Sequence, residues 1–224
     1  VTRDLETFLA IEIFEMNAKP TSTRRETFLK KRQTRMQLNL ESAREAIGKI
    51  EHGCEIFGLT KGNFSYVSIL EELLNQTGQA DVIIATWTAG GADIQKAKEF
   101  IKNKKIRNLR FLVDQSFRTR AGGEYCQLLV KTFGKDAVRF QRSHCKFSLI
   151  TNDEWNLVLR TSMNLNENNR IENYEISDDK NFSNFLMQLT EEIFDQKHEY
   201  TEEDFKKLGE QQNQTPFDKL RGWA

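Results

Sequence analysis

The 224-residue sequence has few of the features that mark secreted, metal-binding or membrane-spanning proteins. Its three cysteines, Cys54, Cys126 and Cys145, show no paired or metal-ligand spacing, which is typical of a reducing compartment. No run of 18 apolar residues occurs, and the N-terminus has no signal-like apolar core. We therefore expect a cytoplasmic protein with no membrane contact, no metal ion and no other cofactor.

A net charge is also absent, because 33 Lys and Arg residues balance 33 Asp and Glu residues. The sequence thus predicts no overall field that would draw the chain to nucleic acid. The charges are nevertheless segregated along the chain. Basic residues dominate 19–36 and 102–120, and acidic residues dominate 191–204. Such asymmetry is compatible with a local surface that binds a polyanion.

Hydrophobic periodicity alternates between strand and helix over most of the chain. Strands are predicted at 54–59, 81–87, 106–114, 137–141, 144–151, 156–162 and 173–177. Helices are predicted at 65–78, 90–103, 122–134 and 181–196. This order predicts an α/β fold, with a mixed, mostly parallel sheet and helices on both faces.

Residues 22–51 carry an apolar stripe with helical spacing, which predicts one long helix ending near Gly53. The opposite face of its first half is almost wholly basic. Three interpretations stay open for that face: solvent exposure, contact with nucleic-acid phosphates, or contact with a dimer partner.

The stretch QRSHCKFSLI, residues 141–150, places a histidine and a lysine two positions apart on a predicted strand. Because residues i and i+2 of a strand share a face, His144 and Lys146 should lie side by side, with Arg142 starting the same row. A neighbouring cation favours the neutral, nucleophilic form of an imidazole. The pair is therefore suited to handling an anion.

Further polar residues follow the next two strands. Ser162 and Asn164 leave the sheet in TSMN, and Glu172 and Glu175 flank the beginning of the following strand. An imidazole is a nucleophile, and a lysine and an amide can neutralise the oxygens of a phosphodiester under attack. A carboxylate can fix the imidazole tautomer, and either glutamate can fill that role. The set is chemically complete for attack on phosphorus.

The pattern His-Cys-Lys at 144–146, Ser-Met-Asn at 162–164 and Glu-Asn at 172–173 resembles the phospholipase D superfamily, whose signature is H-x-K-x4-D-x6-G-S-x-N. The resemblance covers about residues 50–196, which leaves 1–50 as an N-terminal helical extension and 197–224 as a helical tail around a catalytic domain of 51–196. The motif occurs once, which is similar to the nuclease branch whose members form homodimers. It implies a phospholipase D-like fold and metal-independent phosphodiester cleavage through a phosphohistidine on His144. Lys146 and Asn164 would hold the phosphate, Ser162 would add a hydrogen bond, and Glu172 would orient the ring.

Two positions depart from this signature. Thr151 stands where the family has aspartate, and Thr161 stands where it has glycine. Asp153 lies in the adjacent turn, in the wrong register to replace the aspartate directly. An alternative is therefore a nucleic-acid-binding module that keeps the phosphate pocket without turnover.

The predicted substrate is DNA or RNA, in preference to lipid, because the basic segments can follow a phosphate backbone. Arg118 and Arg120 follow a strand and either clamp phosphates or are simply solvated. Arg142 and Arg170 complete the predicted substrate-binding set, and Arg170 can also reach a dimer partner. One histidine cannot serve as both nucleophile and leaving-group acid, so a homodimer should supply a second His144. His52 and His198 are expected at the surface, and Trp87 and Trp155 in packing more often than in base stacking.

Overall fold

The computed structural model describes residues 40–166 and 170–195. Its strands are β1 Glu55–Thr60, β2 Ala80–Thr86, β3 Ile106–Asp114, β4 Val138–Gln141, β5 Phe147–Thr151, β6 Asn156–Thr161 and β7 Glu172–Asp178. Its α-helices are α2 Ala43–Ile47, α3 Tyr66–Thr77, α4 Gly91–Lys102, α5 Glu124–Phe133 and α6 Lys180–Asp195. Short 3₁₀ turns occupy Gln115–Arg118, Arg120–Gly123 and Lys135–Ala137. The predicted elements between residues 54 and 196 are all present, with boundaries shifted by up to three residues.

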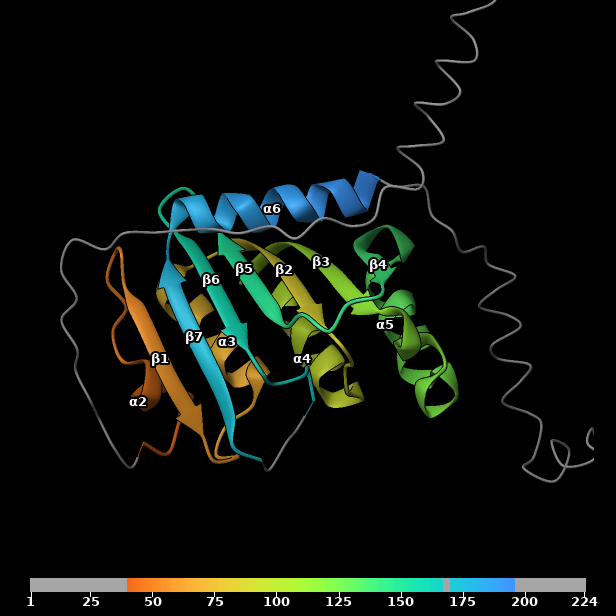
Figure 1. Ribbon diagram of the computed structural model, residues 1–224, viewed down its shortest axis with the longest axis horizontal. Helices are drawn as coiled ribbons and strands as arrows, with labels where there is room; N and C mark the ends of the chain where they lie inside the picture. The colour runs from red at the N-terminus through yellow and green to blue at the C-terminus, as the bar shows by residue number, and fades with distance from the viewer. Residues whose placement is uncertain (1–39, 167–169, 196–224) are drawn as a thin grey trace, which may run out of the picture. The chain divides into compact units, whose positions relative to one another are not determined.

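The strands form one mixed sheet in the order β1-β7-β6-β5-β2-β3-β4 (Figure 1). The predicted α/β class with a mixed sheet is confirmed, but the balance of strand directions differs from the prediction. Only β2-β3 and β3-β4 are parallel, and the other four pairings of the described strands are antiparallel. The β5–β6 hairpin and the addition of β7 and β1 beyond it account for the difference, because hairpin neighbours are antiparallel.

Helices cover both faces of the sheet, as predicted. One face carries the larger apolar cluster, which includes Ile69, Leu73 and Phe100 from α3 and α4. The other face carries a smaller cluster in which Leu186 of α6 packs on the strands. Figure 1 shows α6 on the side of the strands away from α3 and α4. Successive strand residues alternate between the two clusters, so the face of each side chain follows from its register.

The chain before β1 folds as a short helix. Ser42 is extended, and its side chain accepts a hydrogen bond from the Glu45 N–H at 3.2 Å, which caps α2. Gly48, with a φ of 63°, ends the helix in a conformation that favours glycine. The prediction of one continuous helix over 22–51 is therefore wrong from residue 40 onward, and its earlier part lies outside the described residues.

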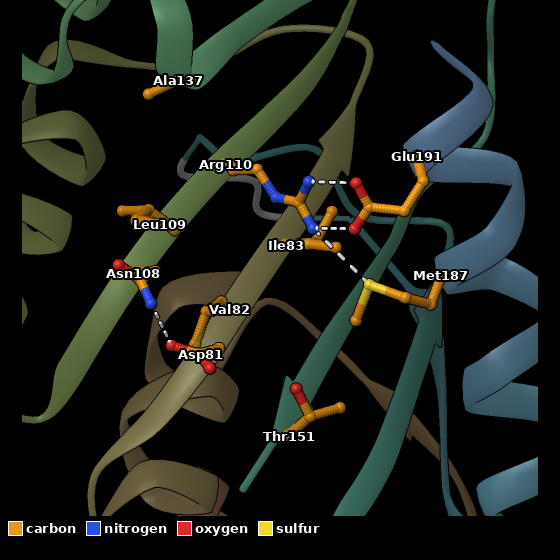
Figure 2. A pocket seen from close by; sticks show the side chains of 10 residues that line it. All are labelled: Asp81, Val82, Ile83, Asn108, Leu109, Arg110, Ala137, Thr151, Met187 and Glu191. Atoms are coloured by element: carbon orange, nitrogen blue, oxygen red, sulfur yellow. Dashed lines mark hydrogen bonds and ion pairs between the residues drawn. The ribbon is translucent and has the colours of Figure 1, made fainter. Parts of the chain in front are cut away.

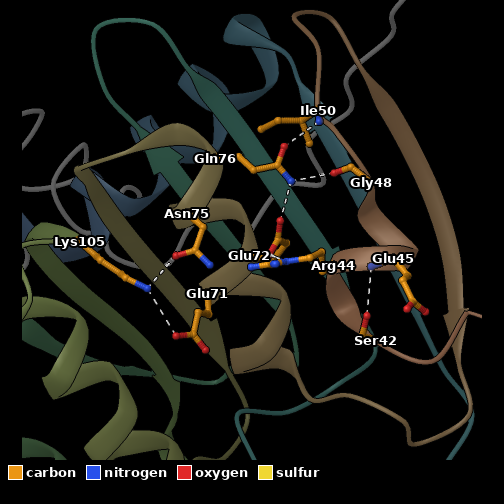
Figure 3. Close-up of polar contacts among 10 residues, drawn as sticks. All are labelled: Ser42, Arg44, Glu45, Gly48, Ile50, Glu71, Glu72, Asn75, Gln76 and Lys105. Carbon is orange, nitrogen blue, oxygen red and sulfur yellow. Dashed lines mark hydrogen bonds and ion pairs between the residues drawn. The ribbon is translucent and has the colours of Figure 1, made fainter.

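Helix α3 holds this segment in place. Gln76 accepts a hydrogen bond from the Ile50 N–H at 2.9 Å and donates one to the Gly48 carbonyl at 2.7 Å (Figure 3). Ile47 and Ile50 are buried against the larger apolar cluster. The apolar stripe of the sequence is thus real at its C-terminal end. The basic run 19–36 and the tail 197–224 lie outside the described residues.

Candidate active site at one edge of the sheet

The polar residues singled out in the sequence lie at one edge of the sheet. Ala85 pairs with Phe147, Phe147 with Arg160, and Thr161 with Tyr174, so these pairs form a line across β2, β5, β6 and β7. The C-terminal ends of β2, β3, β4 and β6 and the N-terminal ends of β5 and β7 meet there. We call this edge the rim. In open α/β sheets the carboxyl ends of parallel strands are the usual place for a ligand.

His144 and Lys146 lie side by side on the rim, as predicted, although β5 begins only at Phe147. The Lys146 Nζ is 3.3 Å from the His144 Nδ1 and donates to the His144 carbonyl at the same distance. The imidazole is exposed, and its ring centroid lies 5.1 Å from that of Trp87 at an interplanar angle of 56°. The predicted strand 144–151 begins three residues too early. Residues 144–146 form no ladder with a neighbouring strand, and β5 begins at Phe147.

Ser162 and Glu172 meet next to this pair. The Ser162 hydroxyl donates to the Glu172 carboxylate in a short hydrogen bond and accepts one from the Asn173 N–H at 3.0 Å. The Lys146 carbonyl accepts from the Thr161 N–H at 3.2 Å, which brings the histidine segment beside Ser162. The role of Glu172 in orienting the imidazole stays a prediction, and its carboxylate accepts from Ser162 in the structure.

Glu175 does not belong to the rim. It lies opposite Arg160 in the β6–β7 register and forms an ion pair with it. Arg160 in turn lies over the Phe182 ring of α6, 5.1 Å from its centroid. Glu175 therefore lies on the face of the sheet that α6 covers. Of the two glutamates, only Glu172 lies on the rim.

Asn164 is held by the buried residues on either side of it. Leu165 donates from its N–H to the Thr88 carbonyl at 3.2 Å and accepts from the Gly90 N–H at 2.7 Å. Within residues 40–166 and 170–195, the Asn164 Oδ1 is buried and has no hydrogen-bond partner. A buried amide left unpaired costs about 1–3 kcal/mol. The unpaired atom is an acceptor, so a hydrogen-bond donor completes it, whereas only the Asn164 Nδ2 can donate to a phosphate oxygen.

The four predicted arginines are placed differently. The Arg120 Nε donates to the Ser116 hydroxyl at 3.1 Å, and its Cζ lies 3.4 Å from the Trp87 ring centroid. Arg118 lies 5.9 Å from the Phe140 ring centroid. Arg142 and Arg170 are exposed. Stacking fixes the guanidinium plane of Arg120 before any ligand arrives.

Two rim residues were missed by the sequence prediction: Trp87, which was expected in core or edge packing, and Asp114. The Asp114 carboxylate accepts hydrogen bonds from the Ser116 N–H at 2.9 Å and the Ser143 N–H at 3.1 Å. Burial acts to raise the pKa of Asp114, but these hydrogen bonds together hold it below its usual range. A signal did exist, because an aspartate at a strand end with serine two residues later is typical of an Asx turn.

Thr151 lies away from the rim, at the far end of β5. It pairs with Asp81 across β2 and lines a shallow pocket on the α6 face, near the Arg110–Glu191 ion pair (Figure 2). Asp81 is bound by Arg107, with 2.6 Å between the Arg107 Nη2 and the Asp81 Oδ2. The departure from the family signature at Thr151 therefore changes the opposite edge of the sheet.

The basic residues of 102–120 do not lie together on one surface. Arg107 pairs with Asp81, Arg110 with Glu191, and Lys105 donates to Asn75 at 2.7 Å. These residues lie on the α6 face or near the far edge of the sheet. Only Arg118 and Arg120 from this segment reach the rim, so it cannot act as one continuous track for a phosphate backbone.

No protein-family model matches the chain, and no curated protein matches it. Similar solved structures include Nuc from Salmonella typhimurium, a phospholipase D family member, at 14% identity and a TM-score of 0.47, covering 66% of this chain and 99% of that one. Phosphatidylserine synthase from Haemophilus influenzae Rd KW20 is 17% identical with a TM-score of 0.48, over 75% of this chain and 44% of that one. Polyphosphate kinase from Porphyromonas gingivalis is 12% identical with a TM-score of 0.48, over 66% and 27%. The chain thus spans about a quarter of the kinase and less than half of the synthase, and at such low similarity these likenesses assign it no activity.

Proposed function

We propose that the protein is a metal-independent phosphodiesterase that cleaves DNA or RNA, with His144 as the nucleophile. The observation that carries this proposal is the gathering of a histidine–lysine contact and the Ser162–Glu172 hydrogen bond on one rim, with Asn164 two residues beyond Ser162. These groups come from the segment before β5, the segment after β6 and the start of β7. A nucleophile, a cation and an amide donor are the parts that attack on a phosphodiester needs.

In the proposed reaction, an imidazole nitrogen of His144 attacks phosphorus and the ester oxygen leaves with a proton from a general acid. Lys146 and Asn164 then donate hydrogen bonds to the non-bridging oxygens, on which charge accumulates. Water attacks the phosphohistidine, the N–P bond breaks, and the imidazole is restored. Ser162, bound to Glu172, adds a further hydrogen bond near the phosphate. The rim therefore accounts for every step except the source of the leaving-group proton.

That proton is assigned to His144 of a second copy of the chain. Attack and departure occur on opposite sides of phosphorus, so one imidazole cannot do both, and a two-fold interface brings the same rim together twice. Arg170, which is exposed beside the rim, is suited to reaching the partner. The test mixes His144→Ala chains with wild-type chains. Activity should fall more than dilution predicts, and a fully active monomer would overturn the dimer.

Nucleic acid is preferred as substrate because four arginines lie near the rim, with Arg120 already oriented by Trp87. In the part of the chain that the structure describes, no helix combines the length and apolar character needed to cross a bilayer. Phosphate contacts carry no sequence information, so the proposal specifies a polynucleotide backbone and no base sequence.

The decisive test is cleavage of labelled single- and double-stranded DNA and RNA in EDTA. Wild type should cleave at least one of the four substrates and His144→Ala none. His52→Ala is the matched control, because His52 is also exposed and beside a tryptophan, at the opposite edge of the sheet. Cleavage that survives His144→Ala would remove the proposed nucleophile.

A binding module without turnover is the second candidate, and Thr151 is the observation that favours it. The structure places Thr151 opposite Asp81 at the far edge, which weakens this argument. The same assay separates the two candidates. Retention of all four substrates without cleavage would establish the binding module.

A further inference from the structure

The Asp114 carboxylate links the segments that follow three strands. Asp114 ends β3, and one of its oxygens accepts from the N–H and the hydroxyl of Ser116 in the turn that follows. The other oxygen accepts from the Ser143 N–H at 3.1 Å, beyond β4. Trp87, after β2, is joined less directly, because Arg120 donates to the Ser116 hydroxyl and lies on the Trp87 ring. The carboxylate and its partners thus join all three segments.

The contacts continue in a closed circuit around the rim. Ser116 accepts from the Arg120 Nε, and Arg120 lies on the Trp87 ring. Trp87 contacts the His144 ring, and His144 directly follows Ser143, which returns to Asp114. A closed circuit restricts each member from two sides. The nucleophile and the stacked arginine of the proposed site are therefore held by the same carboxylate.

We propose that Asp114 is a positioning residue, which holds His144 through Ser143 and Trp87 and holds Arg120 through Ser116. This inference rests on the proposed function for its catalytic meaning, whereas the placement of the ring is a separate structural claim. Asp114 does not contact the reacting atoms in this arrangement. It acts by fixing where the imidazole and the guanidinium stand.

His144 needs such support because it lies outside the sheet ladder. β5 begins at Phe147, and the imidazole is exposed. Sheet hydrogen bonds therefore fix Phe147 but not the histidine three residues earlier. Charge-assisted hydrogen bonds are about twice as strong as neutral ones, and the Asp114 carboxylate directs one of them at the residue next to His144. A misplacement of about 1 Å at a reacting group can cost about 10²-fold in rate.

The chain offers a matched control in Asp178, at the opposite edge of the sheet. Its carboxylate contacts the His52 Nδ1 at 3.2 Å and accepts from the N–H groups of Gly53 and Asn156. Asp178 thus also bridges several backbone segments and a histidine. Replacing either aspartate should lower the melting temperature, but only Asp114 should alter the rim.

The first measurement is steady-state hydrolysis of bis(p-nitrophenyl) phosphate in EDTA. Asp114→Ala should lower kcat by about 10–10²-fold with little change in KM, because the imidazole is displaced while Lys146 and Asn164 still bind phosphate. Asp114→Asn, which keeps one acceptor oxygen, should fall between Asp114→Ala and wild type and gives a second variant if alanine unfolds the chain. Asp178→Ala should keep kcat. An equal fall in kcat for both aspartates would show a merely structural role and overturn the proposal.

The second measurement needs no activity. The chain has three histidines, so the imidazole protons of His144 can be assigned by NMR with His144→Ala. Trp87→Leu removes the ring current and defines the shift of an uncovered imidazole. Asp114→Ala or Asp114→Asn should move the His144 signals toward that value, and Asp178→Ala should move only those of His52. A wild-type shift in both Asp114 variants would overturn the positioning role. If wild type cleaves no phosphodiester, the proposed function fails, and the NMR result still decides whether Asp114 places the ring.

Discussion

Two histidines lie beside tryptophans at opposite edges of the same sheet, and their charged neighbours have opposite signs. His144 contacts Trp87 on the rim and has the Lys146 ammonium 3.3 Å from its Nδ1. His52 stacks on Trp155 with centroids 4.0 Å apart and has the Asp178 carboxylate at 3.2 Å. The residue types at the two edges are nearly the same, and only the third partner differs.

In the proposed mechanism, that difference separates the nucleophile from a histidine that only supports the fold. At the far edge, Asp178 joins the His52 ring to the backbone at Gly53 and Asn156. At the rim, the His144 ring lies beside a cation that can share a bound phosphate with it. Two charged side chains at the far edge have partners in the structure: Asp81 pairs with Arg107, and Lys105 donates to Asn75. The rim instead carries exposed arginines and the buried, unpaired Asn164 Oδ1.

The largest expected effect compares the two histidines directly. His144→Ala should reduce phosphodiester cleavage by about 10⁶-fold, the scale seen when a nucleophile is lost. His52→Ala should leave the rate unchanged and lower only the melting temperature. Rates come from EDTA assays on labelled substrate, and melting temperatures from circular dichroism. Equal loss of activity in the two variants would erase the distinction between the edges.

The next effect concerns the two lysines. Lys146→Gln should lower kcat by about 10²–10³-fold, because one donor to the developing charge is lost. Lys105→Gln removes a lysine that bonds to Asn75 at the far edge and should leave kcat unchanged. Single-turnover rates with saturating enzyme measure both. A Lys146→Gln enzyme with wild-type kcat would show that Lys146 has no part in charge stabilisation.

A smaller effect is expected from the arginines and is read from salt dependence. Removing one phosphate contact should reduce the slope of log affinity against log salt by about 0.9 for duplex or 0.7 for single strands. Arg142→Gln on the rim should show this change. Arg107→Gln, whose guanidinium is engaged with Asp81, should not. Binding of His144→Ala protein to labelled DNA by fluorescence anisotropy avoids cleavage, and equal slopes in both variants would contradict the rim as the binding surface.

The smallest effect is a pH dependence at the far edge. The hydrogen bond from Arg107 holds the pKa of Asp81 below its ordinary value of 3.8. Because the folded pKa is the lower one, this contribution to stability is present above the unfolded pKa and is lost as pH falls through the folded pKa. The pair is partly exposed, so solvent screening makes its contribution small. Urea unfolding between pH 6 and 3 should show a shallower loss in Asp81→Asn than in wild type, whereas parallel curves would rule the pair out as a source of acid sensitivity.

The fold could be predicted from the sequence to a large extent because local patterns suffice for it. β3 matches its predicted range, and the helix predicted at 65–78 is α3, residues 66–77. The strand directions were harder, since periodicity identifies a strand without identifying its neighbour. The helix over 22–51 failed at Ser42 and Gly48, where a side-chain cap and a left-handed glycine outweigh the apolar stripe.

The candidate site likewise contains contacts that a local sequence pattern predicts and contacts that depend on the order of the strands. His144 and Lys146 lie together because two positions in an extended chain share a face, whether or not a ladder forms. Glu172 could not be distinguished from Glu175 by sequence, because the choice depends on which residue begins β7. The Asx turn of Asp114 with Ser116 has a local signal, but the contacts of Asp114 with Ser143 and of Trp87 with His144 join residues 29 and 57 positions apart. Contacts between strand ends come from the sheet order, which no local pattern records.

The position of β1 has a consequence for the time course of folding. Among the described strands its one neighbour is β7, and Glu55 lies opposite Ser177, 122 residues later in the chain. A ribosome adding roughly 5–20 residues per second needs about 6–25 s to make that stretch. During this interval β1 has been synthesised but has no strand to pair with, while β2, β3 and β4 can already assemble through short crossovers. Assembly during synthesis therefore runs against the order of the chain at this edge, and the first of the described strands to leave the ribosome is among the last of them to be built into the sheet.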